Sequence, residues 1–312
     1  MSTPTTSQWT DLFSYVTGVV RYNDLAYVAS VSDEMRDNRV THSYVTEWDA
    51  GTWRVGDEDD DLLPWDVVAA TLVHTPLEQA LFLGARGNVL MLGSGDTHEE
   101  QIPDNEETGI SGRGNLRGVC AVEGVAYACG MDRQVYRRHD QNDWRALDAG
   151  ARPPLDDEEI VGFETIGGFT GKELYAAGWN GEIWEFGGKR WVQRDSPTNL
   201  ILTALCCAED GFVYIAGQGG TLLRGRNATW EVLEQESVTE DLWSLAWFDG
   251  ALYASSMLGV YRLVNDQLEL VDFGDAQPSS CFHLSAADGV LWSIASKAIV
   301  AFDGVTWTRI DG

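Results

Sequence analysis

The stretch DGFVYIA at residues 210–216 returns as DGALYAS at 249–255 and as DGVLWSI at 288–294. Each copy begins with an Asp-Gly pair, which is typical of a tight hairpin turn. Each then continues into a short run of apolar, aromatic and β-branched residues, which is typical of a β-strand. The central aromatic residues of the three copies are separated by 39 residues. A fixed interval of this length indicates a repeat protein.

Four looser copies precede these three, so the chain carries seven units. The central residues of the units are Tyr27, Phe82, Tyr127, Tyr175, Tyr214, Tyr253 and Trp292. An apolar run precedes each central strand, and two further strand-like runs follow it. The last run contains a tryptophan in five units: Trp53, Trp144, Trp191, Trp230 and Trp307. Four short strands in units of about 40 residues predict an all-β fold, a seven-bladed β-propeller with four antiparallel strands per blade.

The repeat also predicts how the chain is divided. We expect a single propeller domain over residues 1–312, with blades at about 14–55, 66–103, 116–147, 160–194, 200–233, 241–271 and 280–310. Blades stack in a ring because one four-stranded sheet cannot bury both of its faces alone. Residues 8–12 resemble a further outer strand that caps or replaces one in the ring. The charged insertion at 31–42 is expected to be a mobile loop.

Two stretches in the middle of the chain, 179–191 and 217–230, resemble a loose bacterial propeller repeat of the Asp-box or WD-like type. The tail FDGVTW at 302–307 is similar to the end of the Asp-box turn of sialidase-like and photosystem-assembly-factor-like propellers. The resemblance covers about residues 14–310, although the sequence contains no complete Asp-box and no Gly-His signature of WD repeats. It implies the propeller architecture and brings no catalytic residue with it.

The composition is strongly acidic, with 21 Lys and Arg against 49 Asp and Glu and a net charge of −28. Nucleic acid and anionic membranes would be repelled by such a protein, so we expect neither as a partner. Residues 1–8 have no basic or apolar segment of a secretory signal, and no apolar run is long enough to span a membrane. We therefore expect a cytoplasmic protein.

The acidic residues gather in the predicted connections from one blade to the next. They are Asp57, Glu58, Asp59, Asp60, Asp61, Asp104, Glu106, Glu107, Asp156, Asp157, Glu158, Glu159, Asp195, Glu234, Glu236, Glu240, Asp241, Asp272 and Asp275. In propellers these connections lie on one face, the top, together with the turns between the second and third strands. A concentration of carboxylates on one face would steer a basic protein toward it. The alternative is that the acidic loops only keep an aromatic-rich protein soluble.

The turns between second and third strands should add cations and apolar residues to the same face. Our predicted partner-binding residues combine both groups: Asp57, Asp59, Asp60, Asp61, Asp156, Asp157, Glu158, Glu159, Arg86, Arg133, Trp179, Gln218, Met257 and Lys297. Tryptophan and arginine dominate the energetics of protein interfaces. The alternative for the cations is that they pair internally with carboxylates.

A search for catalytic and ligand-binding motifs identifies none. No histidine pair has zinc spacing, the five cysteines contain no C-x-x-C pair, and no nucleophile elbow, phosphate loop or calcium loop is present. We therefore predict no catalytic residue, no metal and no cofactor. The sequence suggests a non-enzymatic, monomeric module that captures a basic protein, by analogy an immunity-type inhibitor of a bacterial toxin. There are two alternatives. One is a carbohydrate-active enzyme with two carboxylates at its centre, and the other is a scaffold with several partners.

Overall fold

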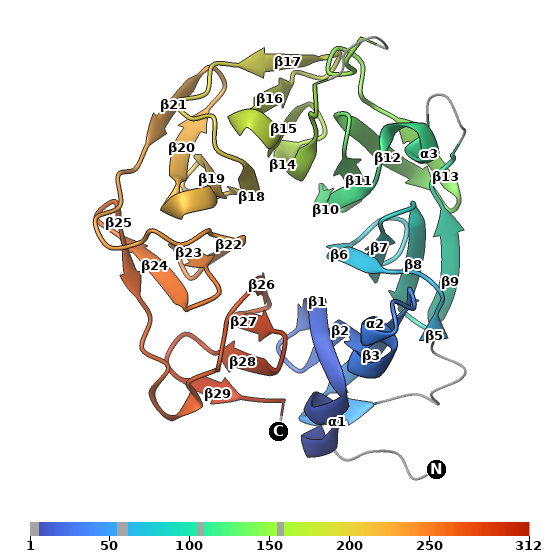
Figure 1. The fold of residues 1–312 in the computed structure, drawn as a ribbon, viewed down its shortest axis with the longest axis vertical. Coiled ribbons are helices and arrows are strands. Elements are labelled where there is room, and N and C mark those ends of the chain that lie inside the picture. Colours follow the sequence, from blue (N-terminus) through green and yellow to red (C-terminus); the bar gives the residue numbers. More distant parts are fainter. Residues whose placement is uncertain (1–5, 55–61, 105–108, 155–158, 312) are drawn as a thin grey trace.

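Seven β-sheets form a closed ring in the computed structural model, which describes residues 6–54, 62–104, 109–154 and 159–311 (Figure 1). The strands of each sheet are antiparallel and follow chain order, with the first strand innermost (Figure 1). Six sheets have four strands, and the first sheet has a fifth, β5 (Leu62–Leu63), which pairs with β3. The seven-bladed propeller predicted from the repeat is therefore confirmed.

The inner half of each blade consists of its first and second strands. The first strands are β1 (Phe13–Tyr22), β6 (Val67–Val73), β10 (Leu116–Val122), β14 (Phe163–Thr170), β18 (Leu202–Cys207), β22 (Ser244–Phe248) and β26 (His283–Ala287). The second strands are β2 (Leu25–Ser32), β7 (Gln79–Gly84), β11 (Val125–Gly130), β15 (Glu173–Gly178), β19 (Val213–Gly217), β23 (Ala251–Ser255) and β27 (Val290–Ala295).

The outer half consists of the third and fourth strands. The third strands are β3 (Ser43–Asp49), β8 (Asn88–Gly93), β12 (Gln134–Asp140), β16 (Ile183–Phe186), β20 (Leu222–Arg226), β24 (Val260–Val264) and β28 (Ala298–Phe302). The fourth strands are β4 (Thr52–Arg54), β9 (Asp96–Gln101), β13 (Asp143–Ala146), β17 (Trp191–Arg194), β21 (Thr229–Val232), β25 (Gln267–Leu270) and β29 (Trp307–Arg309).

Short helices and helical turns occupy some of the connections. They are α1 (Thr6–Leu12), α2 (Asp33–Asp37), α3 (Ile110–Arg113), η1 (Trp179–Gly181), η2 (Gln218–Gly220) and η3 (Gly274–Ala276). No helix in the described part of the chain is long and apolar enough to cross a membrane.

The aromatic residues of the repeat fill the spaces between blades. All seven central residues are buried, with Tyr175 and Trp292 almost completely inaccessible. The tryptophans of three outer strands also fasten their blade to the preceding one. Trp191 donates its indole N–H to the carbonyl of Leu147 at 2.7 Å, and Trp53 donates to the carbonyl of Ile310 at 2.8 Å. Trp144 donates its indole N–H to the side-chain carboxylate of Glu100 at 2.8 Å.

The ring closes between the seventh blade and the first without an exchanged strand. The outer strand of blade 7 is β29, which the chain supplies from its own C-terminal end. Side chains join the two blades: Ser285 Oγ accepts the Val20 N–H at 2.9 Å, and Asp288 accepts the Asn23 N–H at 3.0 Å.

The expectation of a further outer strand at residues 8–12 is wrong, because this segment belongs to helix α1. The fourth strand of blade 7 is β29, so this sheet has its four strands without the segment. The Trp9 ring instead stacks on Phe13, with ring centroids 3.9 Å apart.

The insertion at 31–42 is folded and does not form the expected loop. It contains the end of β2 and helix α2, whose N-terminus is capped by the Ser32 side chain. His42 Nε2 accepts the Ser32 backbone N–H at 2.8 Å and holds the two ends of the insertion together.

Candidate protein-binding face

Backbone hydrogen bonds place the turns between second and third strands beside the connections that enter each blade. The Trp179 N–H donates to the Gly162 carbonyl at 3.0 Å, and Met131 and Gln218 donate in the same way in the neighbouring blades. A glycine precedes each donor because the backbones cross closely; a Cβ on Gly178 would lie 2.1 Å from the Gly162 oxygen. We call the face formed by these turns and connections the top face, and the opposite face the bottom face.

Most of the acidic residues predicted to bind a partner cannot be placed. Asp57, Asp59, Asp60, Asp61, Asp156, Asp157 and Glu158 lie outside the described residues. Glu159 is exposed and accepts a hydrogen bond from Asn180 Nδ2 at 3.0 Å. The described connections contribute further exposed carboxylates to the top face: Asp195, Glu234, Glu236, Asp272 and Asp275.

Arg133 is held inside the protein by an ion pair between blades 3 and 4. Its guanidinium donates to both oxygens of Glu182, with Nε 2.7 Å from Oε2, and lies 5.1 Å from the centre of the Trp184 ring. The positive charge is therefore compensated before any partner arrives.

Lys297 has a similar internal role at the closure of the ring. Its ammonium group donates to Asp33 and to the carbonyls of Thr10 and Phe13, at 2.5, 2.8 and 2.8 Å. A lysine has three donors, and here all three are used within the protein.

The remaining predicted residues differ in how accessible they are. Arg86 and Met257 are exposed in their turns. Trp179 is half-buried and donates its indole N–H to Glu164 at 2.7 Å. Gln218 accepts the Ile201 N–H at 3.2 Å. The structure thus brings these residues to one face but leaves Arg86 and Met257 as the two that are open to a partner.

An exposed aromatic pair was missed by the sequence analysis. Trp243 and Phe282 precede the first strands of blades 6 and 7, and their ring centroids lie 5.6 Å apart. Both belong to the top face and are 38% exposed. They are separated by the repeat interval of 39 residues, which could have revealed them as equivalent positions.

The centre of the ring is a channel whose upper part has a cavity of about 550 Å³. The first strands of all seven blades line it, and Arg117 and Glu164 lie at the wall with 3.7 Å between their charged groups. Glu164 is the single carboxylate among the residues that line this cavity. Glycoside hydrolysis uses two carboxylates, and this lining supplies one.

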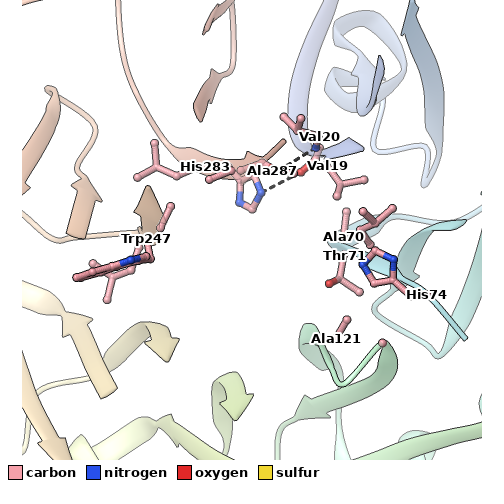
Figure 2. A pocket seen from close by; sticks show the side chains of 17 residues that line it. Val19, Val20, Ala70, Thr71, His74, Ala121, Trp247, His283 and Ala287 are labelled. Carbon is pink, nitrogen blue, oxygen red and sulfur yellow. Dashed lines mark hydrogen bonds between the residues drawn. The ribbon is translucent and has the colours of Figure 1, made fainter. Parts of the chain in front are cut away.

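The lower part of the channel has a second cavity of about 410 Å³ (Figure 2). Trp247 and His74 lie on opposite sides of this cavity (Figure 2). The ring of His283, the first residue of β26, lies between them and higher in the view (Figure 2). His283 Nε2 is 3.0 Å from the Gly18 carbonyl. Burial lowers the pKa of His283 to about 4, against the small opposing effect of that hydrogen bond. The imidazole is therefore neutral at physiological pH.

The described part of the chain contains no group of three or more His, Cys, Asp or Glu side chains arranged to hold a metal ion. All five cysteines are free, and burial raises the pKa of Cys120 to about 12. A thiol with such a pKa is not a nucleophile at neutral pH.

The fold defines the class of the protein, a seven-bladed β-propeller. No protein-family model matches the chain. A curated protein from Pseudomonas aeruginosa, Immune protein Tsi7, is 69% identical over 300 residues, which cover 96% of this chain and 98% of the relative. The chain therefore belongs to the Tsi7 family of immunity proteins.

Solved structures agree on the fold at much lower sequence identity. YCF48 bound to D1 peptide is 15% identical, with a TM-score of 0.65 over 92% of this chain and 90% of that one. The WD40 propeller domain of Doa1 is 13% identical, with a TM-score of 0.62 over 93% and 96%. These likenesses show the propeller architecture alone.

Proposed function

We propose that this protein is a non-enzymatic inhibitor that protects its own cell by binding a basic toxin on the top face. The observation that carries the proposal is the 69% identity, over nearly the full length of both chains, to a protein named for immunity. The net charge of −28 supports a basic partner, because summed carboxylates raise the rate at which a cation-rich protein arrives.

The proposed inhibitor acts as a monomer in the cytoplasm. Two copies with this charge repel each other, which supports the monomer. Five free cysteines support a reducing compartment, since disulfides are uncommon there.

The test uses the full-length chain and candidate toxin-domain proteins encoded by genes that neighbour its own. We expect the toxin to stop growth of a host cell, and co-expression of this chain to restore it. The two proteins should then co-purify as a stable complex. Unchanged toxicity in the presence of folded, expressed protein would contradict the proposal.

A second experiment tests the acidic face. The variant replaces eight carboxylates by amides: Asp57, Asp59, Asp60, Asp61, Asp156, Asp157, Glu158 and Glu159. We expect its association rate with the toxin to fall about tenfold at low salt, and the difference to shrink as salt screens the charges. The control replaces Glu209 and Asp249, two exposed carboxylates of the bottom face. Equal association rates for all three proteins at low salt would contradict a role for the acidic face.

A further inference from the structure

Trp243 and Phe282 are exposed at the rim of the channel, and hydrogen bonds fix the backbone of each. The Trp243 N–H donates to the Ser255 carbonyl at 2.8 Å, and the Ser255 hydroxyl donates to the Phe282 carbonyl. Each aromatic residue directly precedes an innermost strand. The backbone that carries each ring is therefore fixed at the rim.

Further apolar side chains extend this surface across blade 6. Met257 and Leu258, in the turn between β23 and β24, are 47% and 67% exposed. The Cys281 N–H donates to the Met257 carbonyl at 3.2 Å, which fixes the turn beside Phe282. Single exposed apolar residues are ordinary, but a contiguous group marks a contact surface. We call Trp243, Met257, Leu258 and Phe282 the apolar patch.

The apolar patch continues into the channel. Trp243 and Phe282 also line the cavity of about 550 Å³, together with Leu245 and Leu284 below them. A side chain that enters the channel beside the two rings therefore meets Leu245 and Leu284 on the innermost strands. Such a site loses little conformational freedom on binding.

The charges around the apolar patch indicate which partner fits. The connections that flank it, 233–243 and 271–282, contain Glu234, Glu236, Glu240, Asp241, Asp272 and Asp275. The same two connections and the turn at 256–259 contain no lysine or arginine. A second copy of this chain would bring like charges together, which is unfavourable. A partner with basic residues around an apolar protrusion would complement both features.

We propose that the apolar patch is the energetic centre of the toxin interface, and that it takes an aromatic or aliphatic side chain of the toxin at the channel mouth. This proposal rests on the proposed function. The acidic loops speed encounter, and the apolar patch holds the complex, since buried aromatic anchors carry most of the binding energy of an interface.

The test measures binding of the purified toxin to the full-length protein and to Trp243→Ala, Phe282→Ala and Leu258→Glu. We expect each aromatic substitution to raise the dissociation constant about 30-fold or more, mainly through faster dissociation. Leu258→Glu keeps the blade intact, because its side chain is 67% exposed, and should weaken binding as well. The matched control is Phe212→Ala on the bottom face, where the ring is 44% exposed; its affinity should stay within about twofold.

Two outcomes separate the inference from the function beneath it. If the toxin binds the wild-type protein and all three patch variants equally, the assignment of the apolar patch is wrong and the proposed function stands. If the toxin does not bind the wild-type protein, the proposed function itself fails.

Discussion

Arg138 on β12 and Glu100 on β9 form a buried ion pair across the boundary between blades 2 and 3. Arg138 Nη2 lies 2.6 Å from Glu100 Oε1, and Trp144 donates to the other carboxylate oxygen. Burial alone would raise the pKa of Glu100, but the hydrogen bonds from Arg138 and Trp144 outweigh it and leave the pKa below its ordinary value. The carboxylate is therefore charged in the folded protein, and it compensates the buried positive charge of Arg138.

We expect Glu100→Gln to lower the free energy of unfolding by about 3 kcal/mol, because it leaves the Arg138 charge buried without a counter-ion. Urea unfolding at pH 7 measures the change. The control is Glu231→Gln, which breaks an exposed pair with Arg224 and should cost less than about 1 kcal/mol. An equal decrease in the free energy of unfolding in the two variants would show that the buried ion pair stabilises the protein no more than the exposed one.

Lys297→Met tests whether this lysine serves the fold or the partner. Loss of its bonds to Asp33 and to the Thr10 and Phe13 carbonyls should lower the free energy of unfolding by about 1–2 kcal/mol. We expect the folded variant to bind the toxin with unchanged affinity, measured by titration calorimetry. Weaker binding with undiminished stability would instead support Lys297 as a partner-binding residue, as the sequence analysis predicted.

Gly178→Ala should destabilise the protein by more than about 2 kcal/mol, because the added methyl group would overlap the Gly162 carbonyl oxygen. Thermal unfolding gives the comparison with Gly187→Ala. A Cβ at Gly187 meets nothing within 4 Å, so this control should be neutral or slightly stabilising. A Gly178 variant as stable as the Gly187 variant would contradict the close crossing of the two segments.

His283 should make the protein less stable as the pH falls from 6.5 toward 4. Its pKa is about 4 in the folded protein and 6.5 in the unfolded chain, so only the unfolded chain takes up the proton in this window. The full effect would be about 3 kcal/mol, and the partial exposure of the side chain reduces it. Urea unfolding at pH 7, 6 and 5 should show a smaller loss for His283→Gln. Parallel losses in both proteins would mean that the imidazole does not contribute.

The blades could be predicted from the sequence because their signal is local and repeated. The Asp-Gly turns are an example: Asp249 and Gly250, like Asp288 and Gly289, all have positive φ, the conformation that a two-residue hairpin needs. The segment at 8–12 was misjudged because its apolar pattern does not reveal that β29 already fills the outer edge.

The candidate site could be predicted only in part, because it depends on pairs of residues far apart in the chain. Nothing near Arg133 in the sequence indicates that Glu182, 49 residues away, holds its guanidinium. Trp243 lies in the apolar run before a central strand, where the sequence does not distinguish it from a buried residue. Its exposure depends on its position at the rim of the channel, which only the three-dimensional structure shows.

Every sheet of this ring is made from one uninterrupted segment of chain, and blades 7 and 1 are joined by hydrogen bonds and not by a shared strand. A gene that gains or loses 39 codons at a blade boundary would therefore add or remove a whole sheet without splitting another. The three evenly spaced repeats at the C-terminal end have the form that such duplication leaves. We expect a circular permutant opened at a connection between two blades to keep every sheet whole, since each sheet is made from one segment of chain.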